Sequence, residues 1–447
     1  MKHKSLLIVS LLFSTWLIAQ ETPSTLTLQE AIDYALINNR SVKNAVRDIE
    51  AAEKQKWETT ATGLPQINGA VDYQNWIKQQ VSLLPAELAG GTPGTFVPVE
   101  FSPKQSINAT ATLSQLLFDG SYLVGLQSAK VFLEISENAK IKTDLEVRNA
   151  VINAYGNVLL AEENLNIVNK NIEVLEKNLF ETTKIYQNGL AEEESVEQLQ
   201  ITLTGLKNYL NNVKRSKDIA YQLFNITLGI DLNTPISLID SLETLTLQNI
   251  SLELLEADEN IENSIDYQIA KNQEESQELL LKLEKSSFLP TLSAFINGGY
   301  SGYGEKFNFF NNNQEWYGSS LFGVNMSIPI FSSGMRSAAT QRAQINLEIA
   351  QEELTETEQQ LKFQISAAKS DYQFAIEEYQ NKQQNLNLAE RIEEKNQTKF
   401  FEGIASSFDL RQAQTQLYTA QQEYLQSMFN VITKKSELET VLNTLNY

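Results

Sequence analysis

Carboxylates are the main side chains in this chain that can do acid–base or ligand chemistry. The sequence holds 56 Asp and Glu, no cysteine and one histidine, His3. Thiol nucleophiles, disulfides and cysteine-based metal sites are therefore excluded. A pair of carboxylates can hydrolyse a glycosidic bond, but the acidic residues are spread along helical faces with no aromatic-lined pocket evident. We therefore expect no enzyme, and neither a metal site nor a cofactor.

Two acidic segments each follow a glycine that interrupts a long helical pattern. The first segment, after Gly189, contains Glu192, Glu193, Glu194 and Glu197. In the second, Asp409 lies six residues after Gly403. Ser406 and Asp409 have the spacing of a capping box, and an acid in the first turn of a helix is favoured by the helix dipole. A structural role for Asp409 follows from this spacing alone, and the glutamate run is typical of a solvated helix start.

The pattern around these glycines repeats after 214 residues, which indicates an internal duplication. Steps of three and four residues follow each glycine: Val196, Leu199, Leu203, Leu206, Leu210 and Val213, then Leu410, Ala413, Leu417, Ala420, Tyr424 and Ser427. This spacing predicts coiled-coil helices. Residues 122–186 contain no proline, so one helix of about 65 residues would run on the order of 100 Å. A secreted coiled-coil scaffold or adhesin has the same periodicity and stays open as an alternative.

Four segments alternate with period two and are nearly free of charge: residues 64–77, 105–118, 289–304 and 316–331. In 105–118, for example, Ile107 and Leu113 alternate with Asn108 and Thr112. Such segments are typical of transmembrane β-strands, although a soluble antiparallel sheet alternates in the same way. The loops at 82–103 and 305–316 are expected to be exposed tips. A helix with Thr27 and Glu30 in capping-box spacing is expected ahead of the first strand.

Residues 1–19 have the features of a secretory signal peptide, with Lys2 and Lys4 ahead of an apolar run. An uncleaved membrane anchor is the alternative. After residue 20 no segment reaches the length of a membrane-spanning helix, so a membrane form would have to be a β-barrel. A net charge of −21 argues against a nucleic-acid partner and against binding an anionic membrane through a basic patch.

Four strands cannot stand alone in lipid. The two sheet edges would leave on the order of ten backbone groups unpaired, each costing several kcal/mol. Two copies would supply eight strands and three copies twelve, and about twelve leave room for water in the lumen. The small polar side chains on one face suit that wider lumen, so we expect a homotrimer.

Several stretches together resemble the TolC-like outer-membrane efflux proteins. They are LTLQEAIDYALINN (26–39), SQLLFDG (114–120) with SIPIFSSG (327–334), and the glycine turns followed by VEQLQ and LRQAQ. The resemblance covers the whole chain after the leader. It implies a mainly α protein with membrane β: a long coiled-coil α-helical barrel plus four strands per protomer in a trimeric, twelve-stranded outer-membrane barrel. It also implies a passive export channel with a long periplasmic extension.

The partners implied by the resemblance are outer-membrane lipid, a periplasmic adaptor (membrane fusion) protein and an inner-membrane transporter. The expected domains are a signal peptide (1–19), a first repeat (20–227), a linker or equatorial element (228–256) and a second repeat (257–447). Neither the residues nor the resemblance indicates the cargo, and both small molecules and polypeptides stay open.

The resemblance also implies roles for the glycine turns. They would form the periplasmic tips and contact the adaptor through Gln187, Asn188, Gly189, Leu190, Glu402, Gly403, Ile404 and Ala405. Asp409 falls where family members carry an aspartate that narrows the pore. A second family aspartate would fall on Gln412, so this constriction would be less acidic. Glu192, Glu193, Glu194 and Glu197 would then form an acidic mouth around the tunnel or face the adaptor.

Overall fold

The computed structural model describes residues 24–257 and 260–443, so the expected signal peptide lies outside the described residues. The chain divides into two compact units. The first comprises residues 1–49, 136–270 and 354–447, and the second comprises residues 50–135 and 271–353. Each unit is described by itself.

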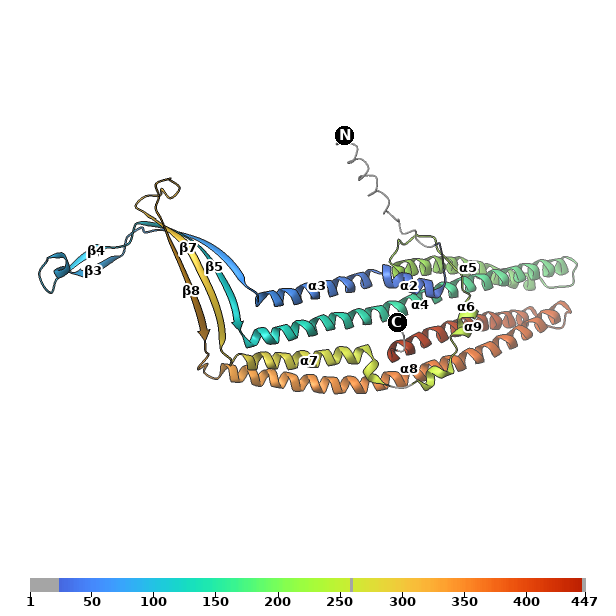
Figure 1. Ribbon diagram of the computed structural model, residues 1–447. Coiled ribbons are helices and arrows are strands. Elements are labelled where there is room, and N and C mark those ends of the chain that lie inside the picture. Colours follow the sequence, from blue (N-terminus) through green and yellow to red (C-terminus); the bar gives the residue numbers. More distant parts are fainter. Residues whose placement is uncertain (1–23, 258–259, 444–447) are drawn as a thin grey trace, which may run out of the picture. The chain divides into compact units, whose positions relative to one another are not determined.

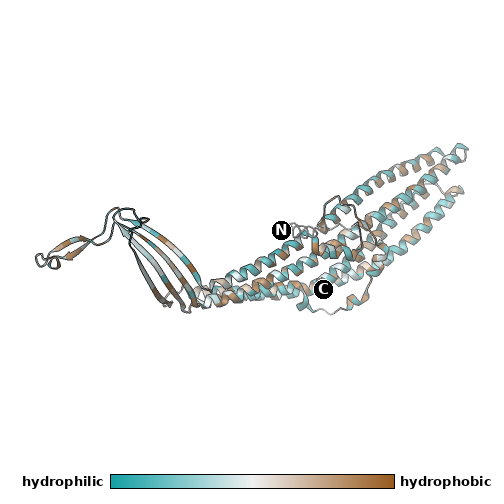
Figure 2. Ribbon diagram, turned by 45° about the horizontal axis from the view of Figure 1, so that its top comes forward, coloured by the Kyte–Doolittle hydropathy of each residue, from teal (hydrophilic) through white to brown (hydrophobic). Residues whose placement is uncertain are grey.

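Helical hairpins dominate the first unit (Figure 1). Helix α4 (Gly120–Gln187) leads into α5 (Glu193–Leu228), and α8 (Met335–Phe401) leads into α9 (Ser407–Leu442). The first unit takes α4 from residue 136 and α8 from residue 354. The long uninterrupted helix predicted for residues 122–186 is confirmed. The predicted seam is buried as well, since Val168, Leu175, Leu199 and Leu203 pack together between α4 and α5. Figure 2 shows the same pattern as brown residues recurring along mostly teal helices.

A short segment between the hairpins combines several small elements. Strand β6 (Ser237–Leu238) pairs in parallel with β1 (Thr25–Leu26), and helix α6 (Leu242–Gln248) follows. The 3₁₀ turns η2 (Leu252–Glu256) and η3 (Ile261–Asn263) complete the segment. Helix α2 (Leu28–Asn38) starts with the predicted capping box of Thr27 and Glu30 and precedes α3 (Arg40–Thr62).

Two buried tyrosines fix this segment to the helices. The hydroxyl of Tyr155 in α4 shares its single proton between an oxygen of Asp240 at 2.7 Å and the carbonyl oxygen of Leu26 at 3.1 Å. Burial raises the pKa of Tyr155 far above its ordinary value. The hydroxyl of Tyr372 in α8 donates to the carbonyl of Asn249 at 2.6 Å. Each helical hairpin thus binds the segment through a tyrosine hydroxyl, Tyr155 from α4 and Tyr372 from α8.

Removing one of these hydroxyls tests its contribution. We expect Tyr155→Phe to lower the free energy of unfolding by about 1–2 kcal/mol, because Tyr155 is fully buried and its hydrogen bonds would be lost without replacement by water. The matched control is Tyr209→Phe, whose partly exposed hydroxyl accepts from Gln422 at 2.8 Å and from Asn164 at 3.2 Å and can be replaced there by water. Urea titration of the helical signal measures both, and an equal loss in the two variants would contradict the proposed hold on Asp240.

A four-stranded antiparallel sheet forms the second unit's β part, in the order β2-β5-β7-β8. Its strands are β2 (Gln66–Asn75), β5 (Gln105–Phe118), β7 (Thr291–Gly304) and β8 (Trp316–Ser327). All four predicted strands are confirmed. Helix α7 (Ile265–Ser286) precedes β7, as α3 precedes β2.

The loop expected at residues 82–103 contains a hairpin that the sequence reasoning did not predict. Strand β3 (Val81–Pro85) pairs with β4 (Phe96–Glu100), and the 3₁₀ turn η1 (Ala86–Ala89) connects them. Gly90 and Gly94 adopt positive φ in this connection. Among the described residues, no helix combines the length and the apolar character needed to cross a bilayer.

Candidate functional site

The four-stranded sheet separates apolar from polar side chains. Residues that pair across neighbouring strands lie on the same face. One row of such residues is Ile67, Leu113, Ile296 and Phe322, and the adjacent row on the other face is Asn68, Thr112, Asn297 and Leu321. The amide of Asn297 donates to the hydroxyl of Thr112 at 2.6 Å. One face is therefore mainly apolar and the other mainly polar.

The apolar face is open in a single copy of the chain. Ile67 is 75% exposed and Phe322 is 69% exposed, which is far more than a soluble sheet leaves uncovered on its core face. The four strands contain one charged residue, Asp72, and its pairing with Asn108 places it on the polar face. Within the described sheet, β2 and β8 each have one edge without a strand partner.

The two glycine turns have the same backbone geometry. Gly189 has φ +74° and Gly403 has φ +76°, and a side chain added to either would meet no atom within 4 Å. After each glycine, an amide bonds the carbonyl five residues earlier: Leu190 to Ile185 at 3.1 Å, and Ile404 to Lys399 at 2.8 Å. This bond is typical of a helix that ends at a left-handed glycine. Both turns lie at the same end of the first unit (Figure 1).

Asp409 closes the capping box that its spacing predicts. Its carboxylate accepts from the backbone amide of Ser406 at 3.0 Å, and its own amide donates to the Ser406 hydroxyl at 3.2 Å. Hydrogen bonds from Ser406 lower the pKa of Asp409 below its ordinary value. The cap therefore stabilises the helix above the unfolded pKa of about 3.9 and weakens as the pH falls through the lowered folded value.

The glutamate run starts α5 without a side-chain cap. Glu192 is the N-cap residue and makes no capping hydrogen bond, while Glu193 and Glu194 lie in the first turn. Glu194 accepts from the amide of Gln198 at 2.8 Å. Carboxylates in a first turn interact favourably with the helix dipole, so the run is suited to an exposed helix start.

A half-buried carboxylate near the second turn was missed by the sequence reasoning. Glu393 in α8 accepts from the amide of Gln414 in α9 at 3.5 Å, and Gln414 is only 1% exposed. Burial raises the pKa of Glu393 above its ordinary value. Burial together with the charge of Glu393 raises the pKa of Tyr418 to about 12. Glu393 precedes another glutamate, Glu394, so nothing in the sequence marks it as the half-buried one of the two.

The groove between α8 and α9 near the second turn has a volume of about 870 Å³. Leu388, Ile392 and Phe408 contribute apolar surface to it, and all three are between 39% and 54% exposed. The guanidinium of Arg411 lies 5.4 Å from the centre of the Phe408 ring, which is within cation–π range. The groove is an open surface of the hairpin and not an enclosed pocket.

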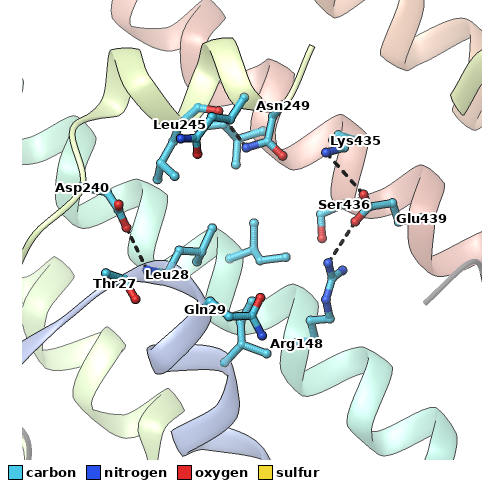
Figure 3. A pocket seen from close by; sticks show the side chains of 14 residues that line it. Thr27, Leu28, Gln29, Arg148, Asp240, Leu245, Asn249, Lys435, Ser436 and Glu439 are labelled. Carbon is cyan, nitrogen blue, oxygen red and sulfur yellow. Dashed lines mark hydrogen bonds and ion pairs between the residues drawn. The ribbon is translucent and has the colours of Figure 1, made fainter. Parts of the chain in front are cut away.

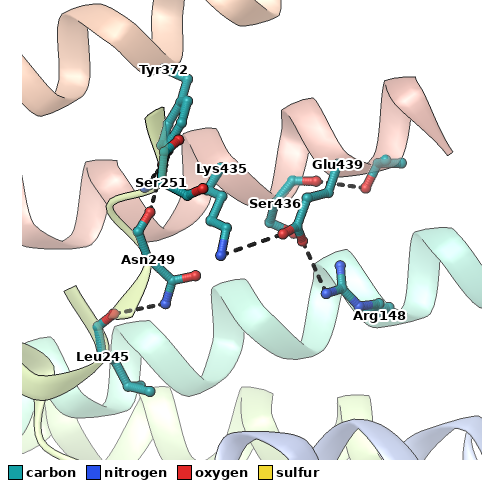
Figure 4. Close-up of polar contacts among 9 residues, drawn as sticks. Arg148, Leu245, Asn249, Ser251, Tyr372, Lys435, Ser436 and Glu439 are labelled. Carbon is teal, nitrogen blue, oxygen red and sulfur yellow. Dashed lines mark hydrogen bonds and ion pairs between the residues drawn. The ribbon is translucent and has the colours of Figure 1, made fainter. Parts of the chain in front are cut away.

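A smaller pocket of about 350 Å³ lies in the first unit beside the start of α2 (Figure 3). Its charged groups are paired with one another or with backbone. Glu439 binds Arg148 at 3.0 Å and Lys435 at 3.5 Å (Figure 4), and Asp240 accepts from the amide of Leu28 at 2.8 Å. Such paired groups hold neighbouring elements together.

No group of three or more metal-ligating side chains gathers within residues 24–257 and 260–443. The structure therefore gives no metal centre in this part of the chain on which to base a function. The features that stand out are the two-faced sheet with open edges and the paired glycine turns.

Comparison with known proteins identifies the family to which this chain belongs. The family described as outer membrane efflux protein matches residues 31–227 and 257–444. The outer membrane protein TolC of Vibrio cholerae is 22% identical over 362 residues, covering 77% of this chain and 79% of that protein. TolC of Escherichia coli is 21% identical over 439 residues, covering 94% of this chain and 82% of that protein.

Solved structures show the same fold. The crystal structure of CusC superposes with a TM-score of 0.74 at 18% identity, covering 93% of this chain and 91% of that one. The outer membrane protein VceC from Vibrio cholerae gives a TM-score of 0.72 at 16% identity, covering 93% and 95%. The chain belongs to the outer membrane efflux protein family, as a TolC-like protein of the outer membrane with a long helical periplasmic part.

Proposed function

We propose that three copies of this chain form a passive export channel through the outer membrane. The observation that carries the proposal is the sheet with one apolar face, one polar face and two unpaired edges. In lipid, each unpaired backbone group would cost several kcal/mol, so the edges of one copy need the edges of another.

The order of the strands suits closure by identical copies. Neighbouring strands from β2 to β8 are all antiparallel, so β2 and β8 run in opposite directions. The β8 edge of one copy can therefore pair in antiparallel fashion with the β2 edge of the next. Three copies give about twelve strands, which leave a watery lumen for the polar faces while the apolar faces contact lipid.

The helical hairpins would continue the channel into the periplasm and end at the glycine turns. There we place the contact with a periplasmic adaptor, which in turn joins an inner-membrane transporter that supplies the energy. The tip residues are Gln187, Asn188, Gly189, Leu190, Glu402, Gly403, Ile404 and Ala405. Leu190 is 81% exposed and Ile404 is 71% exposed, so each tip offers an apolar side chain to a partner.

Acidic residues near the tips would line the entrance. We assign Glu192, Glu193, Glu194 and Glu197 to the mouth and Asp409 to the constriction. Three copies of Asp409 around one axis would attract cations into the pore. The chain itself would catalyse no reaction, and the cargo would be small molecules or polypeptides delivered by the transporter.

The two repeats proposed for the channel are residues 20–227 and 257–447, joined by the element at 228–256. Their equivalence is supported by the 214-residue interval and by the matching hydrogen bonds of the two turns. Each repeat would contribute two strands to the barrel and one helical hairpin to the tunnel.

Neutralising Asp409 tests its role in the pore. We expect Asp409→Asn to shift the ratio of cation to anion permeability toward unity, because three negative charges leave the constriction. Reversal potentials of single channels in a salt gradient measure this ratio. The control is Ser406→Ala, which removes the capping hydroxyl and keeps the charge. If the permeability ratio of Asp409→Asn stays unchanged, or shifts only as much as that of Ser406→Ala, Asp409 acts as a helix cap alone.

Fractionation separates the channel from the remaining alternative, a secreted scaffold or adhesin. We expect the protein to stay with the outer membrane after washing with high salt and urea, and to give stepwise conductance when detergent extracts are added to a planar bilayer. Release by the wash, with no conductance, would favour the scaffold.

A further inference from the structure

We propose that the loop between β7 and β8, residues 305–315, is a lipid anchor that binds the outer boundary of the membrane through exposed phenylalanines. The proposal rests on the channel proposed above, in which the apolar face of the sheet contacts lipid. It adds a specific surface and its partner, the interface between acyl chains and headgroups of the outer leaflet.

The loop folds back over the apolar face of the sheet. Pairing places Tyr73, Ile107 and Gly302 in one row on that face. A Cβ added to Gly302 would lie 3.3 Å from a methyl of Ile107 and 3.3 Å from the ring of Phe309. Phe309 itself is only 2% exposed. The loop therefore packs on the apolar face, where the ring of Phe309 covers the backbone of Gly302.

Aromatic packing holds the loop in this position. The Phe307 ring centre lies 5.4 Å from that of Tyr73 and 5.6 Å from that of Phe309, both edge to face. Tyr73 belongs to β2 and the loop joins β7 to β8, so these contacts cross over β5. At the loop base, the amide of Gln314 donates to the carbonyls of Tyr303 at 3.2 Å and Glu315 at 2.8 Å. The loop therefore contacts β2 through Tyr73 and β7 through the carbonyl of Tyr303.

Two phenylalanines of the loop remain exposed at the surface of this cluster. Phe310 is 83% exposed, with its ring centre 5.9 Å from that of Phe307, which is itself 56% exposed. Residues 307–314, with the sequence FNFFNNNQ, carry no charge and consist only of phenylalanine, asparagine and glutamine. Exposed phenyl rings bury at the boundary between headgroups and acyl chains, while the neighbouring amides stay hydrated.

A lipid surface is favoured over a protein partner because the loop is continuous with the apolar face of the sheet. The apolar face that the loop covers at one end continues along the strands through Val71, Ile296 and Phe322, which are exposed and contact lipid in the proposed barrel. The loop extends this same face by one further apolar layer. Aromatic girdles mark the ends of the apolar band in membrane barrels.

Single-cysteine labelling tests the anchor directly, because the chain contains no cysteine. Phe310→Cys would carry a polarity-sensitive fluorophore in full-length protein reconstituted into phosphatidylcholine vesicles with brominated acyl chains. We expect the brominated lipid to quench this label at least about twofold relative to ordinary lipid, as for a group at the interface. Asn312→Cys, in the polar part of the same loop, should be quenched less.

A third label separates failure of the anchor from failure of the channel. Val324→Cys reports on the apolar face of β8, away from the loop. Quenching at 324 without quenching at 310 would overturn the anchor and leave the channel standing. Quenching at neither position would overturn both.

Combining Phe309→Ala with each of the labelled variants tests whether the packing of Phe309 over Gly302 positions the loop. We expect it to reduce quenching at 310 and leave quenching at 324 unchanged, because Phe309 holds the loop against the face. Unchanged quenching at 310 would show that the loop binds lipid without being positioned by the sheet, which contradicts the proposed geometry.

Discussion

Gly229→Ala is expected to lower the free energy of unfolding by about 2–4 kcal/mol, the sum of backbone strain and overpacking. Gly229 ends α5 with φ +82°, a conformation that alanine adopts only with strain. An added Cβ would also lie 2.4 Å from the carbonyl oxygen of Asn38 and 2.8 Å from its carbon. Those atoms are backbone at the end of α2, so they cannot rotate away as a side chain would.

Gly403→Ala is the matched control. Gly403 has a similar φ of +76°, but an added Cβ would meet no atom within 4 Å. We expect a loss of only about 1 kcal/mol from strain in the left-handed region. Urea midpoints followed by the helical circular-dichroism signal compare the two variants. Equal losses would show that the close approach of Gly229 to α2 contributes nothing.

Val324→Arg is expected to impair stable insertion into a bilayer, because a cation on the lipid face costs up to about 2–4 kcal/mol per copy. Val324 pairs with Ala294 on the apolar face and is 55% exposed in the single copy. In the proposed barrel its side chain points into acyl chains. Refolding into vesicles, followed by protease protection of the inserted chains, measures the inserted fraction.

The neighbouring residue supplies the control for this substitution. Asn325 pairs with Ser293 on the polar face, so Asn325→Arg would place the same charge in the lumen. We expect nearly normal insertion and an altered preference for ions. Poor insertion of Asn325→Arg together with normal insertion of Val324→Arg would reverse the assignment of the two faces.

Most of the architecture could be predicted because its periodicities are long and regular. The helix predicted for 122–186 differs from α4 by two residues at its start and one at its end. The strand predicted to continue to residue 331 ends at Ser327, two residues ahead of Pro329. Proline lacks the amide that a further ladder bond would need. Local backbone chemistry therefore accounts for the main boundary error.

Contacts between distant segments could not be predicted in this way. The hydrogen bond from Tyr155 to Asp240 joins residues 85 positions apart. Neither a tyrosine in a long helix nor an aspartate in a loop signals such a contact in the sequence. The β3–β4 hairpin was missed because prolines and glycines conceal two strands of only five residues. The strand-like residues 96–99 were the available signal.

For the candidate site, the sequence was informative about local geometry and silent about assembly. The positive φ of Gly189 and Gly403 and the capping box of Asp409 follow from residue types that only certain backbone conformations favour. The pore, mouth and adaptor roles of these residues depend on other chains, so they stay predictions. The half-buried position of Glu393 depends on the register between α8 and α9, and the heptad pattern does not distinguish between the adjacent Glu393 and Glu394.

The number of chains in the purified particle tests most directly whether sibling copies close the sheet. Native mass spectrometry of the protein released from detergent micelles counts the chains in each particle. Our account predicts three chains per particle, stable until the β2 and β8 edges are separated by denaturant. A single chain that stays dispersed in water without detergent would contradict the closed channel, because its apolar face and strand edges would then need no partner.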